Sequence, residues 1–449
     1  MKYFGTDGIR GTYGDIEVSE PFFYALGRAL AELVEQSYQN NFVVVGGDTR
    51  ASTKSLKDAF LKGAQEGGLR CEDMAVLPTP ALAYCVLAKK AQFGVMITAS
   101  HNPYYDNGIK FFNSHAQKVD DATQLALEEK LEKYLDKTVE ICAKEFEPCE
   151  IPVRCPSSDG YIEKMTSLFP ANMLSGVKIA IDMANGATSK VSSEVLRRYG
   201  AEVFEKSCQP NGMNINEGVG SQHPATLEAF CKEVGADVGF AHDGDGDRVI
   251  VVDENASVLE GEEVLGLIAL DAKARGILPK PAIVTTMQSN MGLDESLEKQ
   301  GISVLRSGIG DRLVMKMMHE NGLNVGGENS GHYIFSEISP CGDGLAAALS
   351  VLSVMASSGK KLSVLRDCVA MYPVQSKAIK VVRKTPIEKT PTLSKVVSEC
   401  EAMLSGCGRL LVRYSGTEKK IRLLVEGKDA DLIKACMAKL EKSVENDLQ

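Results

Sequence analysis

Hydrophobic and polar residues alternate in blocks along the chain, and one order of blocks occurs three times. A short apolar run, which predicts a buried strand, is followed by a small polar loop, a helical stretch and a second strand. The first strands of the three copies are expected at residues 42–45, 177–181 and 282–286, and the helices at 56–67, 189–199 and 293–300. Short strand–helix–strand connections of this kind indicate a sheet with helices on its faces.

A further apolar strand follows in each copy and ends in an unusual polar loop. The loops are Thr98–Pro103, His242–Arg248 and Gly326–His332, after strands expected at 93–97, 236–241 and 323–325. Open α/β sheets hold their ligands just beyond the carboxyl ends of strands. We therefore expect the functional residues of the three copies in these equivalent loops.

The last part of the chain follows a different pattern. Residues 365–378 are expected to form a connector, strands are expected at 408–413 and 421–426, and an amphipathic helix follows from 429 to about 444. The predicted fold class is therefore α/β, with three similar α/β domains and a smaller α+β domain at the C-terminal end. The predicted domain boundaries are 1–150, 151–252, 253–367 and 368–449.

Composition narrows the class of protein. The 449 residues are enough for three or four domains. A net charge of −10 and a pI near 5.4 argue against a nucleic-acid binder or a polybasic membrane anchor. The 12 cysteines show no zinc-ligand spacing and predict the reduced thiols of a cytoplasmic protein. We recognise no signal peptide and no apolar run near the ~20 residues of a membrane span.

The strongest chemical signal is the segment Asp243-Gly-Asp-Gly-Asp-Arg248. Its three carboxylates, Asp243, Asp245 and Asp247, alternate with glycine and can face one hard cation, and an oxygen-only donor set suits Mg²⁺. A solvated acidic turn is the alternative, although its acids would repel one another. Arg248 could hold a phosphate beside the metal.

Three residues near the first loop are candidates for catalysis. Ser100, at the end of a predicted buried strand, could carry a phosphoryl group that completes the metal shell; a turn or cap residue is the alternative. Lys110 could transfer a proton or neutralise charge, or it could be a solvated lysine. Arg10 lies in a glycine-rich loop where a phosphate contact is expected, with a plain turn as the alternative.

Two further loops carry recognition chemistry. Acceptors and donors gather in Glu328, Asn329, Ser330 and His332, which suits sugar hydroxyls or an amine, although His332 could be a structural histidine. The segment Arg413–Glu418 with Arg422 combines guanidinium groups, hydroxyls and free N–H groups into a phosphate cradle, with an ordinary hairpin turn as the alternative. Together these residues support phosphoryl transfer on a phosphorylated sugar or polyol.

Four of these motifs occur in the order found in a known family. The segments Thr-Ala-Ser-His-Asn-Pro, Asp-Gly-Asp-Gly-Asp-Arg, Gly-Glu-Asn-Ser-Gly-His and Arg-Tyr-Ser-Gly-Thr-Glu resemble those of the α-D-phosphohexomutase superfamily, and the resemblance covers essentially the whole chain. The opening Phe4–Gly11 and the run Tyr105–Phe112 look most like the bacterial branch that acts on glucosamine phosphates.

The resemblance implies four domains around a central cleft, three of them α/β units with mixed sheets. It implies that Ser100 is the phosphoserine, with Mg²⁺ held by its phosphate and by Asp243, Asp245 and Asp247. The sugar-reading residues would be Glu328, Asn329, Ser330 and His332, and the distal phosphate loop would comprise Arg413, Ser415, Gly416, Thr417 and Arg422. Proton transfer and charge stabilisation would fall to Arg10, His101, Lys110 and Arg248, with Lys110 as the general base.

The implied reaction passes the phosphoryl group of Ser100 to glucosamine 6-phosphate and returns the other phosphate of a 1,6-bisphosphate. The implied cofactors are Mg²⁺ and an activating hexosamine or glucose 1,6-bisphosphate, and the product would feed UDP-N-acetylglucosamine and cell-wall synthesis. The expected partner is a small phosphosugar, without nucleic acid or membrane, and a homodimer follows from the resemblance alone. Two departures stand out: Lys419 replaces a usual proline, and Asn329 replaces a commoner glutamine or methionine.

Three other functions compete with this one. A phosphomannomutase or phosphoglucomutase would use the same residues on another sugar. A metal-dependent sugar phosphatase would hydrolyse the phosphate on Ser100. A phosphosugar sensor would bind without turnover, which Ser100 and the three aspartates argue against.

Overall fold

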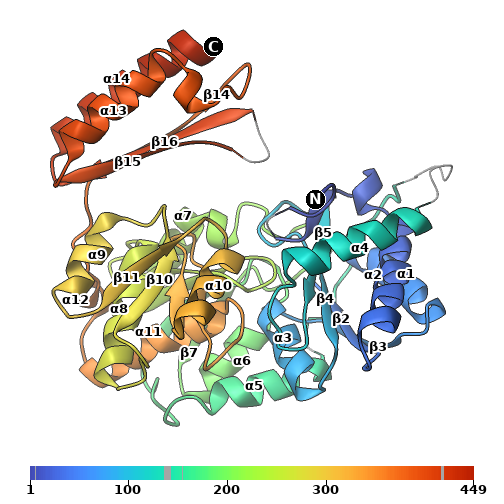
Figure 1. Cartoon of the computed structure of the whole chain (residues 1–449). Helices are drawn as coiled ribbons and strands as arrows, with labels where there is room; N and C mark the ends of the chain where they lie inside the picture. Colours follow the sequence, from blue (N-terminus) through green and yellow to red (C-terminus); the bar gives the residue numbers. More distant parts are fainter. Residues whose placement is uncertain (6, 136–142, 154, 416–418) are drawn as a thin grey trace. The chain divides into compact units, whose positions relative to one another are not determined.

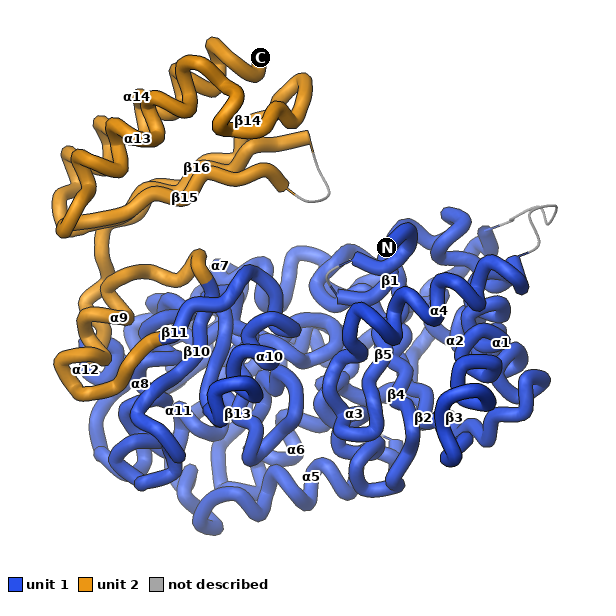
Figure 2. Tube along the Cα trace, viewed as in Figure 1, with its two compact units in different colours: residues 1–286, 305–367 blue, residues 287–304, 368–449 orange. Residues whose placement is uncertain are grey.

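The computed structural model describes residues 1–5, 7–135, 143–153, 155–415 and 419–449. The chain divides into two compact units, as Figure 2 shows. The first unit comprises residues 1–286 and 305–367, and the second comprises 287–304 and 368–449.

The first sheet of the larger unit is mixed. Its strand order is β1-β5-β4-β2-β3, with β2 parallel to β3 and β4, and β5 antiparallel to β4 and β1 (Figure 1). The strands are β1 (Ile9–Thr12), β2 (Phe42–Gly47), β3 (Arg70–Val76), β4 (Phe93–Ile97) and β5 (Asp106–Phe112). Every residue of β2 and β4 is buried, as expected for continuous apolar runs covered on both faces.

Two helices of this domain cross unusually closely. The helices are α1 (Glu20–Ser37), α2 (Thr53–Glu66), α3 (Thr79–Ala88) and α4 (Asp121–Tyr134). A Cβ atom added to Gly27 on α1 would lie 2.3 Å from the carbonyl oxygen of Phe60, and one added to Gly63 on α2 would lie 2.1 Å from that of Tyr24. The two backbones therefore touch, and only glycine fits at these positions.

The second and third sheets repeat the arrangement of the first. The second has the order β7-β6-β8-β9 and the third β11-β10-β12-β13. Their strands are β6 (Lys178–Asp182), β7 (Glu202–Lys206), β8 (Val238–His242), β9 (Val249–Val252), β10 (Ala282–Thr286), β11 (Ser303–Ser307), β12 (Val325–Gly327) and β13 (Tyr333–Phe335). In all three sheets a last parallel strand turns back into an antiparallel strand, through the hairpins β4–β5, β8–β9 and β12–β13.

The helices accompanying these sheets are α5 (Asp159–Thr166), α6 (Val191–Arg198), α7 (Pro224–Val234), α8 (Gly261–Ala274), α10 (Asp311–Asn321), α11 (Gly344–Ser358) and α12 (Leu362–Leu365). Short 3₁₀ turns occupy Ile16–Val18, Pro156–Ser158, Gly220–Gln222, Arg366–Cys368 and Ile387–Lys389. The three copies expected from the sequence are thus confirmed as three mixed sheets. Each unusual loop forms the turn of the last hairpin in its sheet.

The smaller unit is built on an antiparallel sheet of order β14-β16-β15. Its elements are α9 (Met291–Glu298), β14 (Val374–Lys380), α13 (Leu393–Leu404), β15 (Gly408–Tyr414), β16 (Lys420–Gly427) and α14 (Ala430–Leu448). Helices α13 and α14 cover one face of the sheet (Figure 1), and their apolar residues share a core with Ile421, Leu423 and Val425 of β16. This is the smaller α+β domain that the sequence predicts.

The expected connector at 365–378 is wrong in its second half. Residues 374–378 belong to the edge strand β14, which pairs with β16 from Val374↔Glu426 to Lys380↔Lys420. Most of this strand is exposed and polar, so its sequence lacks the alternation that indicates a strand. Helix α9, which belongs to the third copy in sequence, lies in the smaller unit, where the Asn290 amide donates to the Tyr372 carbonyl at 2.9 Å.

No helix among the described residues is long and apolar enough to cross a membrane.

Replacing Gly27 by alanine should destabilise the larger unit, because the added methyl group must push α1 away from α2. We expect a loss of about 1–3 kcal/mol in the free energy of unfolding, measured by urea denaturation. The control Lys62→Ala lies on the exposed face of α2, the helix that α1 contacts, and should change stability by less than about 0.5 kcal/mol. Equal stability of the two variants would contradict close backbone contact.

Candidate active site

The first and second hairpin loops meet at Ser100. Its hydroxyl donates a hydrogen bond of 2.6 Å to Asp243 Oδ2, and the residue is 1% exposed. The backbone of Ser100 has φ +53°, a left-handed conformation that non-glycine residues rarely adopt. The side chain is therefore held at a defined point above the carboxylates.

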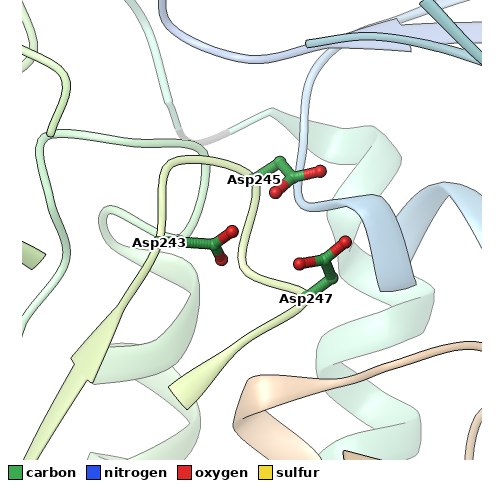
Figure 3. Close-up of side chains that lie close together, drawn as sticks. All are labelled: Asp243, Asp245 and Asp247. Atoms are coloured by element: carbon green, nitrogen blue, oxygen red, sulfur yellow. The ribbon is translucent and has the colours of Figure 1, made fainter. Parts of the chain in front are cut away.

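The three aspartates of the second loop form a compact cluster (Figure 3). One oxygen from each of Asp243, Asp245 and Asp247 lies within 4.8 Å of the others, and all three residues are buried. Asp245 Oδ1 and Asp247 Oδ1 are buried and accept no hydrogen bond from any described residue. Burial, reinforced by the other two carboxylates, raises the pKa of Asp243 well above its usual value. Buried carboxylate oxygens at this spacing that accept no hydrogen bond fit a divalent cation such as Mg²⁺.

Lys110, on β5, faces the same carboxylates. Its Nζ lies 2.9 Å from Asp245 Oδ2, 3.0 Å from Asp247 Oδ2 and 3.3 Å from Asp7 Oδ2. Burial by itself would lower the pKa of this lysine, but Asp245, Asp247 and Asp7 outweigh it, and the pKa lies well above the ordinary value. Lys110 is therefore protonated in this arrangement and neutralises the aspartate cluster.

The ion pairs continue into a closed ring of alternating acids and bases. From Asp247 the ring passes to His332 Nδ1 at 3.7 Å, and from His332 Nε2 to Asp311 Oδ2 at 3.3 Å. Lys118 Nζ bridges Asp311, at 2.5 Å, and Asp7, which returns to Lys110. The ring joins the opening loop, the strand β5 and its following loop, the aspartate loop, the helix α10 and the third hairpin loop.

Electrostatics in the ring favour a charged His332. Burial would lower the pKa of its imidazole, but Asp311 and Asp247 raise it above the ordinary value. For Asp247, burial would raise the pKa, and Lys110 and His332 instead hold it well below the usual range. The acidic and basic groups of the ring thus stabilise each other in their charged forms.

His101 differs from these groups. Burial, with Arg248 and Arg10 nearby, lowers the pKa of its imidazole to about 4, so the ring is neutral near pH 7. Its Nδ1 lies 3.4 Å from the Ser100 hydroxyl oxygen. Arg10 pairs with Asp7, and Arg248 Nε lies 4.0 Å from Asp247 Oδ1. Two guanidinium groups therefore flank the neutral imidazole.

The third hairpin loop contacts the second. The backbone N–H of Val249 donates to the Gly331 carbonyl at 3.0 Å, and a Cβ atom added to Gly331 would lie 2.5 Å from the Val249 carbonyl oxygen. Glu328 Oε1 accepts from the Gly310 N–H at 2.9 Å, whereas Asn329 is exposed. The Ser330 hydroxyl is buried without a hydrogen-bond partner among the described residues.

The predicted distal phosphate loop lies in the smaller unit. Arg413 and Arg422 stand opposite each other on β15 and β16, and burial together with Arg422 lowers the pKa of Arg413. They line a pocket of about 170 Å³ with Gln288 and Ser376. The two opposed guanidinium groups place positive charge at this pocket, and guanidinium groups suit phosphate. The Ser415 carbonyl accepts from Lys384 at 2.6 Å, while Gly416 and Thr417 lie outside the described residues.

The structure thus brings most of the sequence-predicted residues of the larger unit together. Hydrogen bonds and ion pairs connect Ser100, His101, Lys110, Asp243, Asp245, Asp247, Arg248 and His332, and Arg10 joins them through Asp7. The sequence reasoning missed Asp7, Lys118 and Asp311. Asp7 lies in the same glycine-rich opening as Arg10, which was a usable signal, but Lys118 and Asp311 stand in segments without a motif.

Models of known protein families match four successive parts of the chain. They are described as phosphoglucomutase/phosphomannomutase alpha/beta/alpha domain I (residues 1–138), domain II (159–257), domain III (260–372) and the C-terminal domain (377–443).

Full-length relatives support the same family. A phosphoglucosamine mutase of Symbiobacterium thermophilum is 39% identical over 449 residues, covering 100% of both chains. A phosphoglucosamine mutase of Haemophilus influenzae is 40% identical over 445 residues, covering 99% of this chain and 98% of the relative.

Solved structures share the fold. A phosphoglucomutase/phosphomannomutase family protein of Burkholderia thailandensis has a TM-score of 0.80 at 21% identity, covering 98% of this chain and 96% of that one. An N-acetylphosphoglucosamine mutase of Aspergillus fumigatus, solved in complex with GlcNAc-6P and magnesium, has a TM-score of 0.64 at 18% identity, covering 92% and 85%.

Three mixed-sheet domains, a smaller C-terminal domain and a serine over an aspartate cluster define the architecture of a phosphohexose mutase. With four matching domain models and relatives at 39–40% identity over their full length, the chain belongs to the phosphoglucomutase/phosphomannomutase family. The predicted membership of the α-D-phosphohexomutases is confirmed, and so is the predicted fold class.

Mg²⁺ should stabilise the protein through the aspartate cluster. A ligand that binds only the folded state at 100 times its Kd adds about 2.7 kcal/mol, so the Tm should rise by several degrees with Mg²⁺. The double variant Asp245→Asn with Asp247→Asn should lose this rise, as measured by calorimetry. The control Asp182→Asn changes a buried aspartate whose oxygens accept from Ala184 and Gly220, and it should keep the rise. A Mg²⁺ effect that survives in the double variant would place the cation elsewhere.

Proposed function

We propose that this protein is an isomerase that interconverts glucosamine 6-phosphate and glucosamine 1-phosphate through a phosphoserine at Ser100 and a 1,6-bisphosphate. The carrying observation is the buried Ser100 hydroxyl, held 2.6 Å from Asp243 at the edge of the three-carboxylate cluster. The full-length relatives named phosphoglucosamine mutase support this choice of sugar.

The proposed chemistry is a reversible phosphoryl transfer. The bond between phosphorus and Ser100 Oγ breaks as a bond to a sugar hydroxyl oxygen forms, and the hydroxyl proton leaves. A Mg²⁺ ion bound by Asp243, Asp245, Asp247 and the phosphoserine would offset negative charge on the transferring group. Arg248 and Arg10 act electrostatically on His101, the residue after Ser100, and are proposed to stabilise the same charge.

The proton of the sugar hydroxyl needs an acceptor. We retain Lys110 as the proposed general base, and its ion pairs set a condition on that role. In contact with Asp245 and Asp247 its pKa is raised and it stays protonated, so it can accept a proton only after separating from them. His101 is already neutral, and its proposed role is to hold the reacting groups beside Ser100.

Substrate recognition is divided between two sets of residues. Glu328, Asn329, Ser330 and His332 are proposed to contact the sugar hydroxyls and amine, and the buried, unpartnered Ser330 hydroxyl supports this among the described residues. Arg413, Ser415 and Arg422, with Gly416 and Thr417, are proposed to hold the phosphate that is not being transferred. The opposed Arg413 and Arg422 support an anion there.

Several finer statements belong to the same proposal. The domains are proposed at 1–150, 151–252, 253–367 and 368–449. Mg²⁺ and an activating hexosamine or glucose 1,6-bisphosphate are the proposed cofactors. A cytoplasmic location and a homodimer stay predictions.

A mutase acting on glucose or mannose phosphates is the second candidate, because the matching domain models carry the names of those activities. Turnover of the three hexose 6-phosphates by the purified protein decides between them. We expect kcat/KM for glucosamine phosphate to exceed the other two by at least about tenfold, equivalent to about 1.4 kcal/mol of transition-state discrimination. A preference for glucose or mannose phosphate would replace the proposed substrate, and release of inorganic phosphate without isomerisation would indicate a phosphatase.

Ser100 should carry the phosphoryl group. Intact mass spectrometry of the purified protein should show a fraction one phosphoryl group heavier, mapping to Ser100 after digestion. Ser100→Ala should abolish this fraction and lower kcat by at least about 10⁴-fold, because the covalent route is removed. The control Ser350→Ala removes another buried serine hydroxyl, bonded to the Ala346 carbonyl, and should keep both. Phosphate found only on other residues would refute the mechanism.

A further inference from the structure

Arg50, in the loop after β2, is a fully buried arginine that touches no proposed substrate-binding residue. Each of its five side-chain N–H groups has an acceptor. Nε donates to Asp48 Oδ2 at 2.8 Å, and the other four donate to backbone carbonyls of the loop that carries Ser100. These carbonyls belong to Ser100 (3.0 Å), Asn102 (2.8 Å), Pro103 and Asp106 (2.8 Å).

Asp48 fixes the other side of Ser100. Its Oδ2 accepts from the Thr98 hydroxyl at 2.7 Å, and the Thr98 oxygen in turn accepts from the backbone N–H of Ser100 at 2.9 Å. The Asp48–Arg50 pair, whose side chains are both fully buried, therefore holds the peptide groups on both sides of the Ser100 Cα. These are the groups whose orientation defines the left-handed backbone of Ser100.

A residue from the second α/β copy, Asn216, also donates hydrogen bonds to this loop. Asn216 Nδ2 donates to the Ser100 carbonyl at 2.8 Å and to the Asn102 carbonyl at 3.0 Å, which are two of the four carbonyl groups that accept from Arg50. The aspartate loop approaches here as well, since a Cβ atom added to Gly244 would lie 2.7 Å from the Ser100 carbonyl oxygen and 2.9 Å from Asn216 Nδ2. The serine loop and the aspartate loop are thus joined at one carbonyl group.

We propose that Asp48, Arg50 and Asn216 are positioning residues that lock the Ser100 backbone in its left-handed conformation and thereby set the place of its hydroxyl over the aspartate cluster. A left-handed conformation at a non-glycine residue persists only where its surroundings enforce it. Without the lock, the loop relaxes and the serine oxygen leaves its position beside Asp243. The role in catalysis rests on the proposed function, whereas the effect on the loop does not.

The test compares Arg50→Lys with Arg366→Lys. Lysine keeps a charge beside Asp48, but its single ammonium group cannot serve four separate carbonyls. Arg366 is a matched control, because its guanidinium also bridges several acceptors, namely Asp253, Glu263 and the Val258 carbonyl, away from the serine loop. We expect Arg50→Lys to lower kcat about 100-fold with KM changed less than about twofold, the signature of a misplaced reacting group. Arg366→Lys should lower the Tm by a comparable amount and leave kcat within about twofold of wild type.

Asn216→Ala provides a second variant should Arg50→Lys not fold. It should lower kcat in the same way, and the double variant should lose less than the product of the two single effects, because both side chains act on the same carbonyls. A crystal structure of either variant gives a readout independent of activity: Ser100 should leave the left-handed region, and its hydroxyl should no longer reach Asp243.

The outcomes separate the two proposals. A variant whose crystal structure keeps the left-handed Ser100 and its contact with Asp243 refutes the lock. If the wild-type protein is phosphorylated and active, equal kcat values for Arg50→Lys and Arg366→Lys also refute it. A wild-type protein that carries no phosphate on Ser100 and shows no mutase turnover refutes the proposed function, and the crystal structures of the variants still test the lock.

Discussion

The structure of the larger unit depends on the compensation of buried negative charge. Three carboxylates lie within 4.8 Å of one another, and a buried charge without a partner is strongly unfavourable. Arg248 of the same loop lies beside Asp247, and two further compensating groups come from elsewhere: Lys110 from the first sheet, and His332 from the third hairpin loop. Lys110 and His332 come from other α/β domains than the aspartates. The negative charge of the aspartate cluster is therefore fully compensated only when the three α/β domains are in contact.

The repeated hairpin explains why these groups meet. In each sheet a parallel strand turns back into an antiparallel one, and the turn is packed against a turn or strand of a neighbouring copy. Glycine makes the approach possible: Gly244 lies against the Ser100 carbonyl and Gly331 against the Val249 carbonyl, where a Cβ atom would collide. Three loops that would be exposed in isolated hairpins thereby form one buried site.

The charged side chains that characterise the candidate sites of the two units have opposite signs. In the larger unit Ser100 lies over a carboxylate cluster, so the phosphate proposed there would need a cation beside it, with Arg10 and Arg248 as the proposed further partners. In the smaller unit Arg413 and Arg422 stand opposite each other and line one pocket. Local positive charge thus reconciles a chain of net charge −10 with the anionic phosphosugar that the proposed function requires.

The sequence alone determined the three α/β copies and the central residues of the candidate site. Continuous apolar runs mark β2 and β4, and Ser100 and the three aspartates stand in short motifs whose chemistry is local. Strand β14 escaped notice because an exposed edge strand needs no apolar alternation. Only the tertiary structure decided the roles of Lys118, Asp311 and the Asp48–Arg50 lock. Their ion pairs and carbonyl contacts join segments that are distant in the sequence, so they depend on which loops the fold brings together. The residues next to them in the sequence do not indicate these contacts.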